Sequence, residues 1–138
     1  MKIGLDVDDT IMRQPEFFSL LSRAAKEKGH EVHVVTTRPR TDFDRQRTLD
    51  DLTSGGIAYD LIYHLPKQEG EVDDCPHADL DDYQKFVWQK IRYSQENKID
   101  IFFDDDDRLI PLFKRFAPEI QIFQVCKHDI DRSGTGLL

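Results

Sequence analysis

The sequence predicts an α/β protein, a Rossmann-like three-layer αβα sandwich around a five-stranded parallel sheet. Short apolar runs alternate with helical patterns along the chain, which is typical of parallel strands joined by right-handed helical crossovers. The chain has 138 residues, enough for one ordinary domain, so we expect residues 1–138 to form a single unit. Hydrophobic residues make up 38% and charged residues 33%, which supplies a core beneath a solvated surface and excludes intrinsic disorder for the whole chain.

Five short apolar runs are the expected strands. The first ends abruptly in acid, as a buried parallel strand does at its carboxyl end. The second is rich in valine, and Pro39 ends its pairing soon afterwards. In chain order, the strands are expected over residues 2–7, 32–35, 57–63, 99–103 and 120–125.

Four helical patterns separate these strands. Apolar residues recur at helical spacing after Pro15, and Gly29 can close this first helix. Thr41 and Asp44 resemble a capping box for a second helix that ends at residues 55–56. The third helix can be capped by Asp81 or Asp82 and carries an apolar stripe of Phe86, Val87 and Ile91, and a short fourth helix is expected over residues 109–116.

Two segments are expected to lie outside these elements. Residues 65–79 are polar and contain prolines and a glycine, so they should form a long loop, which is more often functional than idle. The tail, residues 132–138, is expected to fray. Because a helix and a strand occupy most of residues 11–36, no large cap domain fits there, and the acidic loop 65–79 is the candidate for a minimal lid.

Charge and composition exclude several classes of protein. The net charge of −8 disfavours general binding to nucleic acid or to anionic membranes, unless basic residues cluster. No stretch is long and apolar enough for a membrane helix, and the acidic start does not resemble a signal peptide. Two cysteines suit free thiols in a reducing compartment, so we expect a soluble cytoplasmic protein.

Acidic residues gather directly after the first and fourth expected strands. Asp6, Asp8 and Asp9 follow the first strand, and residues 104–107 follow the fourth. In parallel sheets, ligands bind outside the carboxyl ends of the strands, so these acids can meet at one site. Converging carboxylates are stable only with a cation or with bound protons, and oxygen ligands without histidine or cysteine favour Mg²⁺. The alternative is an acidic turn at the first strand and a helix cap at residues 104–107, where Asp106 or Asp107 can cap while Asp104 and Asp105 are placed for metal.

Further polar residues could complete a phosphate site. Thr36 offers a hydroxyl and a backbone N–H at the end of the second strand, and Arg38 follows it closely. Lys85 could point its ammonium to the same end of the sheet from the third helix. Lys90 would otherwise serve as well, and a lone lysine there is usually part of a solvated face.

These motifs, in this order, resemble the haloacid dehalogenase (HAD) superfamily of phosphohydrolases over residues 2–125. The Asp-x-Asp-x-Thr motif corresponds to residues 6–10, the strand-ending threonine to Thr36, the helix lysine to Lys85, and the acidic pair to Asp104 and Asp105. Asp106 and Asp107 offer another register for that pair. Asp9 departs from the family, which often has glycine there, although aspartate tolerates turn geometry.

The resemblance implies Mg²⁺-dependent phosphatase chemistry through an aspartyl-phosphate intermediate. Asp6 would attack phosphorus, Asp8 would act as acid and then base, and Thr36 and Lys85 would hold phosphate oxygens. The implied metal ligands are Asp6, Asp8, Asp104 and Asp105. Thr10, Thr37 and Arg38 would contribute to the substrate site, with Thr10 orienting the turn at Asp8.

Within the superfamily, the chain is most similar to the 3′-phosphatase domains of bacteriophage polynucleotide kinases. The similar segments are residues 36–38, Thr48, Leu49 and Leu52, residues 56–60 and residues 81–85, the last of which favours Lys85 over Lys90. The resemblance implies a nucleic-acid 3′-end phosphate as substrate. Residues 68–84 contain no lysine or arginine and many acids, so a nucleotide end or a small phosphomonoester is a better expectation than a long duplex. No kinase P-loop is present, and a catalytically silent domain that binds a phospho-ligand or a protein partner is the alternative.

Two Cys-x-His pairs stand apart from this pattern. Cys75 with His77 and Cys126 with His128 are residues that can bind zinc, but their spacing is unusual. Incidental thiols and surface histidines are the alternative. The sequence leaves the oligomeric state and the pathway open.

Overall fold

A computed structural model describes residues 1–126 of the chain, and these form a five-stranded, all-parallel sheet between two layers of helices. The α/β sandwich predicted from the sequence is therefore confirmed. The strands lie in the order β3-β2-β1-β4-β5. Their bounds are Lys2–Leu5 (β1), Glu31–Thr36 (β2), Leu61–His64 (β3), Ile101–Asp104 (β4) and Gln121–Gln124 (β5).

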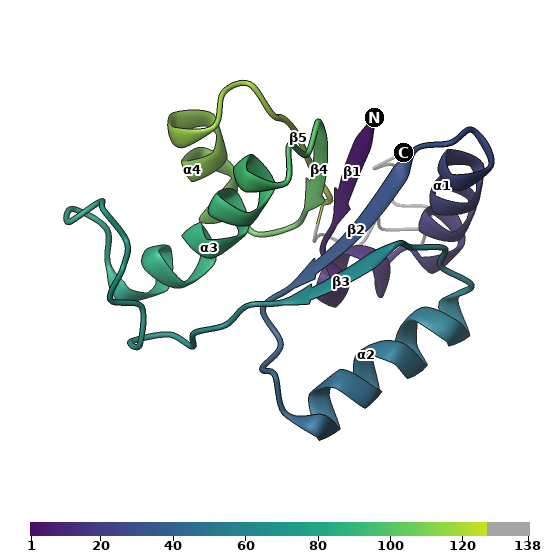
Figure 1. Cartoon of the computed structure of the whole chain (residues 1–138), viewed down its shortest axis with the longest axis horizontal. Coiled ribbons are helices and arrows are strands. Elements are labelled where there is room, and N and C mark those ends of the chain that lie inside the picture. Colours follow the sequence, from purple (N-terminus) through teal and green to yellow (C-terminus); the bar gives the residue numbers. More distant parts are fainter. Residues whose placement is uncertain (127–138) are drawn as a thin grey trace, which may run out of the picture.

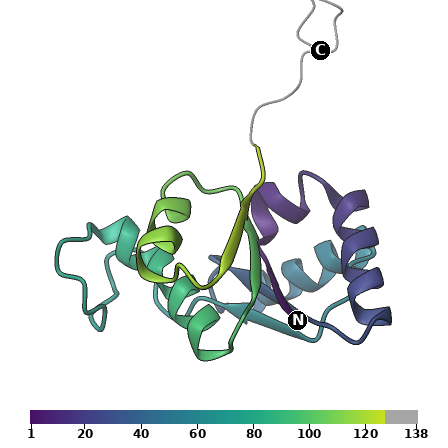
Figure 2. The same cartoon turned by 90° about the horizontal axis from the view of Figure 1, so that it is seen from above.

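The helices cover opposite faces of this sheet in pairs. The helices α1 (Pro15–Glu27) and α2 (Asp42–Gly55) lie on one side, and α3 (Asp82–Glu96) and α4 (Leu109–Phe116) lie on the other (Figures 1 and 2). Two N-caps expected from the sequence are present, because the side chains of Thr41 and Asp81 accept hydrogen bonds from the backbone N–H groups of Asp44 and Gln84. None of the helices in residues 1–126 is long and apolar enough to cross a membrane.

Side chains that alternate along the strands supply one core to each helical layer. Val34 packs with Phe18 on the α1 side, and Val35 packs with Ile91 on the α3 side. Gly4 allows the close approach of the Phe102 ring, since a Cβ atom at position 4 would lie 2.3 Å from Phe102 Cδ2. The two cores together cover the inner strands β2, β1 and β4. Because these strands are parallel, their carboxyl ends lie at the same edge of the sheet.

The third strand is shorter than the expected run over residues 57–63. The backbone N–H of Ala58 donates to Ser22 Oγ at 3.0 Å, and that of Asp60 donates to the Val32 carbonyl at 2.8 Å. The Asp60 carboxylate in turn accepts from the Val32 N–H. Residues 57–60 therefore approach the sheet through these bonds, and regular pairing with β2 begins only at Leu61.

The loop over residues 65–79 is tied to α3 and α4. Lys67 exchanges backbone hydrogen bonds with the Gln89 side chain, and Asp74 and Asp79 form ion pairs with Arg92 and Arg115. Its role as a lid stays a prediction. The predicted fraying of residues 132–138 lies outside the described residues.

Candidate active site at the carboxyl ends of the strands

A cavity opens where the strand order reverses, between β1 and β4, which is the usual place for a ligand in a doubly wound sheet. Its volume is about 180 Å³. It is lined by Asp6, Asp8, Asp9, Thr37, Tyr83, Lys90 and residues 104–106. Residues from three strand ends (β1, β2 and β4) and one helix, far apart in the sequence, thus share one small space.

A buried lysine joins two of these acids. The ammonium of Lys90, on α3, donates hydrogen bonds of 2.7 Å to Asp6 Oδ1 and to Asp104 Oδ2. The three side chains are 2%, 6% and 1% exposed, respectively. Burial alone would lower the pKa of Lys90, but the charges of Asp104 and Asp6 and the hydrogen bonds with them raise it overall. Lys90 is therefore a fixed cation at neutral pH.

One lysine does not balance the two carboxylates of Asp6 and Asp104. Burial raises the pKa of Asp6 well above its usual value, and the charge of Asp104 raises it further, although Lys90 acts in the opposite direction. Burial raises the pKa of Asp104 as well. Asp105, also buried, brings a third carboxylate to the same point. The cluster therefore favours a further cation or a proton.

The three carboxylates of Asp6, Asp104 and Asp105 could hold a metal ion. One oxygen from each lies within 4.8 Å of the others, and they are the only such group among residues 1–126. The Thr10 hydroxyl lies 2.8 Å from Asp6 Oδ2 and 3.3 Å from Asp105 Oδ1, so it bridges two of them. A donor set made only of hard oxygens fits Mg²⁺ better than zinc.

Asp8 lies beside this cluster on the turn Val7–Ile11 (η1), with half of its side chain exposed. The turn reverses at Asp9, which adopts a left-handed conformation with φ 61° and ψ 5°. Glycine adopts this conformation most easily and aspartate tolerates it, so Asp9 can occupy this position of the turn. Hydrogen bonds from Arg38 lower the pKa of Asp8, while partial burial acts in the opposite direction.

The structure places the residues predicted after β2 in three different environments. Thr37 lines the cavity. Thr36 is fully buried and does not line the cavity, and its hydroxyl accepts a hydrogen bond from the Arg38 N–H at 3.2 Å. Arg38 is also buried, and its guanidinium donates to Asp8, Thr48 and Asp51. Arg38 therefore contacts the site through Asp8 and not through the cavity.

The structure brings Lys90, and not Lys85, to the cluster. Lys85 is half-buried, and its ammonium has no hydrogen bond or ion pair among residues 1–126. The sequence carried a signal for Lys90, because it falls between Val87 and Ile91 on the apolar stripe of the third helix. A charged residue on a buried stripe requires a charged partner.

The aspartates at residues 104–107, which begin at the last residue of β4, lie in different surroundings. Asp104 and Asp105 face the cluster, whereas Asp106 accepts from the Arg108 N–H at the start of α4 and from the Tyr83 hydroxyl. Tyr83 was not expected at the site. It lines the cavity, and burial, followed by the bond to Asp106, raises its pKa.

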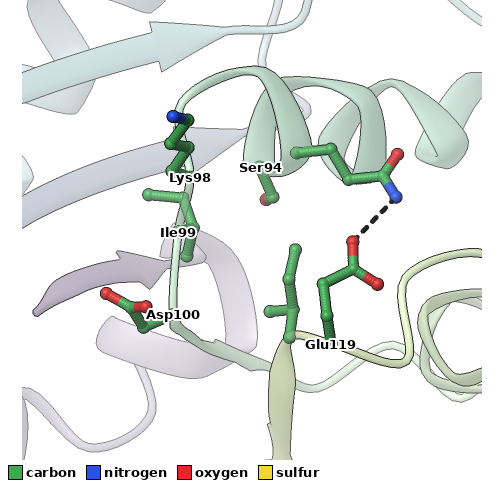
Figure 3. Close-up of a pocket in the computed structure, with 7 residues that line it drawn as sticks. Ser94, Lys98, Ile99, Asp100 and Glu119 are labelled. Carbon is green, nitrogen blue, oxygen red and sulfur yellow. Dashed lines mark hydrogen bonds between the residues drawn. The ribbon is translucent and has the colours of Figure 1, made fainter.

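A second cavity of about 300 Å³ lies at the opposite ends of the strands (Figure 3). It is lined by Ser94, Gln95, residues 98–100, Glu119 and Ile120. Three of its polar side chains are paired: Gln95 donates to Glu119, Ser94 donates to the Lys90 carbonyl, and Asp100 accepts from the Lys2 N–H. Within residues 1–126, no cluster of buried carboxylates like that at the carboxyl ends lines this cavity.

The Cys-x-His residues do not form a metal site within residues 1–126. His77 stacks on Phe116 with ring centres 3.8 Å apart, and Cys75 and Cys126 are free thiols. His128, the fourth predicted zinc ligand, lies outside the described residues.

Neither a protein-family model nor a curated protein matches this chain. The fold is similar to chains in two solved structures, titled "Structure of Pnkp1/Rnl/Hen1 complex" and "Structure of the Pnkp1/Rnl/Hen1 RNA repair complex". Both have a TM-score of 0.62 and 18% identity, and the match covers 94% of this chain. It covers 47% and 43% of those chains, so this chain spans less than half of their length. At this identity the comparison establishes that the chain shares its fold with a part of those proteins.

Proposed function

We propose that this protein is a Mg²⁺-dependent phosphatase of the HAD type, which hydrolyses a phosphomonoester through an aspartyl-phosphate. The observation that carries the proposal is the buried cluster of Asp6, Lys90, Asp104 and Asp105, open to a cavity at the switch point of the sheet. Asp8 lines the same cavity two residues after the proposed nucleophile. Buried charges of this kind are costly, so their presence at a cavity favours a functional role.

Asp6, Asp104 and Asp105 would hold the metal ion, and the resemblance adds Asp8 as a further ligand through its carbonyl. When bound, Mg²⁺ neutralises charge on the phosphoryl oxygens and orients the phosphate for in-line attack. The raised pKa of Asp6 supports this role, because a buried carboxylate with too few cations gains most from another.

The reaction would proceed in two displacements. In the first, an Asp6 oxygen forms a bond to phosphorus while the bond to the leaving oxygen breaks, and the Asp8 carboxyl gives its proton to that oxygen. In the second, the Asp8 carboxylate takes a proton from water, and the water oxygen displaces Asp6 from phosphorus. Inorganic phosphate and the free Asp6 carboxylate result, with Asp8 protonated again.

Lys90 and Thr37 would hold the remaining phosphate oxygens. Lys90 takes the role that the resemblance gave to Lys85, since its ammonium is already beside Asp6. Thr37 lines the cavity, whereas Thr36 would act through its bond to the backbone of Arg38. Thr10 would act on the acids and not on the substrate, because its hydroxyl bridges Asp6 and Asp105.

We propose the phosphorylated end of a nucleic acid, or a nucleotide, as the substrate class. Three exposed arginines, Arg40, Arg45 and Arg47, lie in the loop after β2 and in the first part of α2, and Arg47 acts electrostatically on Asp8. A strand end could place its backbone phosphates there. The fold shared with chains of an RNA repair complex supports the same class.

The test is hydrolysis of 4-nitrophenyl phosphate by the purified chain with and without Mg²⁺. We expect Mg²⁺-dependent turnover that Asp6→Asn abolishes and that Asp100→Asn, at the opposite end of the sheet, leaves unchanged. Equal rates for Asp6→Asn and the unaltered chain would rule out the nucleophile. No turnover on any substrate, with Mg²⁺ binding retained, would favour the silent phospho-ligand binding domain.

A panel of phosphate esters would then test the substrate class. Nucleoside 3′- and 5′-phosphates, sugar phosphates and 3′-phosphorylated oligonucleotides should be compared at two salt concentrations. If several backbone phosphates are bound, kcat/KM for the oligonucleotide should fall more steeply with salt than that for the nucleotide. Equal slopes would remove the electrostatic basis for a nucleic-acid substrate.

A further inference from the structure

The guanidinium of Arg38 is committed to protein partners on every side. Its Nε and one terminal nitrogen donate to the two oxygens of Asp8 at 3.0 and 2.8 Å. That terminal nitrogen also lies 2.8 Å from Asp51 Oδ2, and the other donates to Thr48 Oγ1 at 3.2 Å. The Arg38 side chain is only 3% exposed and does not line the cavity. A residue held in this way does not meet the substrate directly.

The backbone of Arg38 is fixed as firmly as its side chain. Its N–H donates to the Thr36 hydroxyl, and its carbonyl accepts a 3.1 Å hydrogen bond from Nδ1 of His64 at the end of β3. Arg38 therefore connects β2, β3 and α2. On the side of the cavity, its guanidinium binds the carboxylate of Asp8. Asp8 itself is half-exposed and lines the cavity.

We propose that Thr48 and Asp51, on α2, are positioning residues that orient the Asp8 carboxylate through Arg38. This inference rests on the proposed function and extends it to a helix that has no residue lining the cavity. The two hydrogen bonds that Arg38 donates to Asp8 set the plane of the Asp8 carboxylate, and those that it donates to Thr48 and Asp51 set the plane of the guanidinium. Proton transfer depends on such alignment, so a residue that fixes it affects the rate without touching substrate.

Asp51→Asn tests the proposal, since it removes the charge behind Arg38 and keeps the shape of the side chain. Thr48→Val removes the hydroxyl in the same way. We expect each to lower steady-state kcat by about 10–100-fold with little change in KM, as is usual for residues that orient a reacting group. Asp50→Asn is the matched control, because Asp50 is the exposed neighbour whose side chain, within residues 1–126, is hydrogen-bonded only to Gln46 on the same helix.

Burst kinetics separate positioning from a merely structural effect. Nitrophenolate leaves without a proton, so attack by Asp6 on 4-nitrophenyl phosphate should be spared, while water attack still needs Asp8 as a base. Asp51→Asn and Asp8→Asn should therefore both release a rapid burst of nitrophenolate, close to one per active site, before a slow steady state. An alkyl phosphate should give no burst, because its leaving oxygen needs the Asp8 proton.

Three results would overturn the inference. The first is an unchanged kcat in Asp51→Asn and Thr48→Val. The second is a loss of rate equal to the loss of folded protein, with no burst. The third is hydrogen exchange at the Arg38 Nε–H, followed by ¹⁵N NMR, that is no faster in Asp51→Asn than in the unaltered chain. The NMR measurement does not depend on turnover, whereas failure of the proposed function itself would appear as an inactive unaltered chain.

Discussion

The two ends of the sheet carry charged residues of the same kinds in very different surroundings. At the carboxyl ends, Lys90, Asp6 and Asp104 are withdrawn from water, and the pKa values of both acids are raised. At the amino ends, the pair Lys2–Glu31 spans 3.7 Å with side chains 38% and 47% exposed. An exposed pair is screened and contributes little, whereas a buried group depends on its partners.

The comparison also shows that cavity size is a poor guide to function here. The cavity at the amino ends is larger, about 300 Å³ against 180 Å³ at the carboxyl ends. Its Ser94, Gln95, Asp100 and Glu119 side chains are paired with each other or with the backbone. The smaller cavity is lined by Asp6 and Asp104, two buried carboxylates that share one lysine, and this arrangement distinguishes it from the larger cavity.

Removing Lys90 should have the largest effect on the free energy of unfolding. Lys90→Met leaves Asp6 and Asp104 buried without their cation, so the free energy of unfolding should fall by about 3–5 kcal/mol at neutral pH. Phosphatase activity should disappear as well. Urea unfolding followed by circular dichroism gives the free energy, and added Mg²⁺ should restore part of it.

Lys85→Met is the matched control on the same helix. Because the Lys85 ammonium has no partner among residues 1–126, its replacement should change the free energy of unfolding by less than about 0.5 kcal/mol. Equal losses for the two variants, or loss of activity only in Lys85→Met, would contradict the assignment of Lys90.

The pH dependence of stability should show an intermediate effect. The pKa values of Asp6 and Asp104 in the folded protein are raised above the unfolded value of 3.8, so the folded protein binds these protons more tightly than the unfolded chain does. Stability should therefore fall as the pH rises above about 4, by at most about 1.4 kcal/mol per pH unit for each proton released, until the folded pKa is passed. Asp104→Asn should flatten this slope.

Magnesium binding should report on the same carboxylates. At a free Mg²⁺ concentration of 100 times the dissociation constant, binding should raise the free energy of unfolding by about 2.7 kcal/mol at neutral pH. Asp104→Asn should lose most of this gain. Thermal unfolding with and without Mg²⁺ measures both. As a control, EDTA should remove Mg²⁺ and reverse the gain in stability. A gain retained in Asp104→Asn would place the ion elsewhere.

The smallest effect on the free energy of unfolding is expected at the amino ends of the strands. Lys26 forms an ion pair with Asp60. Burial raises the pKa of Asp60, but hydrogen bonds from Lys26 and from the Val32 N–H lower it by more, so that it lies below its usual value. Lys26→Met should cost only about 0.2–1 kcal/mol, and less in high salt, because solvent screens the pair. Stability from Asp60 should be lost as the pH falls through its lowered pKa. A cost as large as that of Lys90→Met would erase the distinction between the two ends.

Much of this architecture could be predicted from the sequence because it depends on local patterns. The alternation of apolar runs and helical stripes predicted a parallel sheet, and acids directly after the first and fourth runs predicted where charge would converge. The helix over residues 109–116 and the N-cap at Thr41 were predicted correctly. The start of β3 was not, because tertiary bonds to Ser22 and Val32 hold residues 57–60 outside the regular ladder.

Which side chains meet at the site was decided by the tertiary structure. Lys85 and Lys90 lie on one helix, but five residues correspond to about 7.5 Å along its axis and about 140° around it, so only one can reach Asp6. Arg38 follows a strand end like a phosphate ligand, yet α2 packs Thr48 and Asp51 against its guanidinium and leaves it facing Asp8. Local sequence sets the helical face and the strand end. The docking of one element on another sets which residue arrives there.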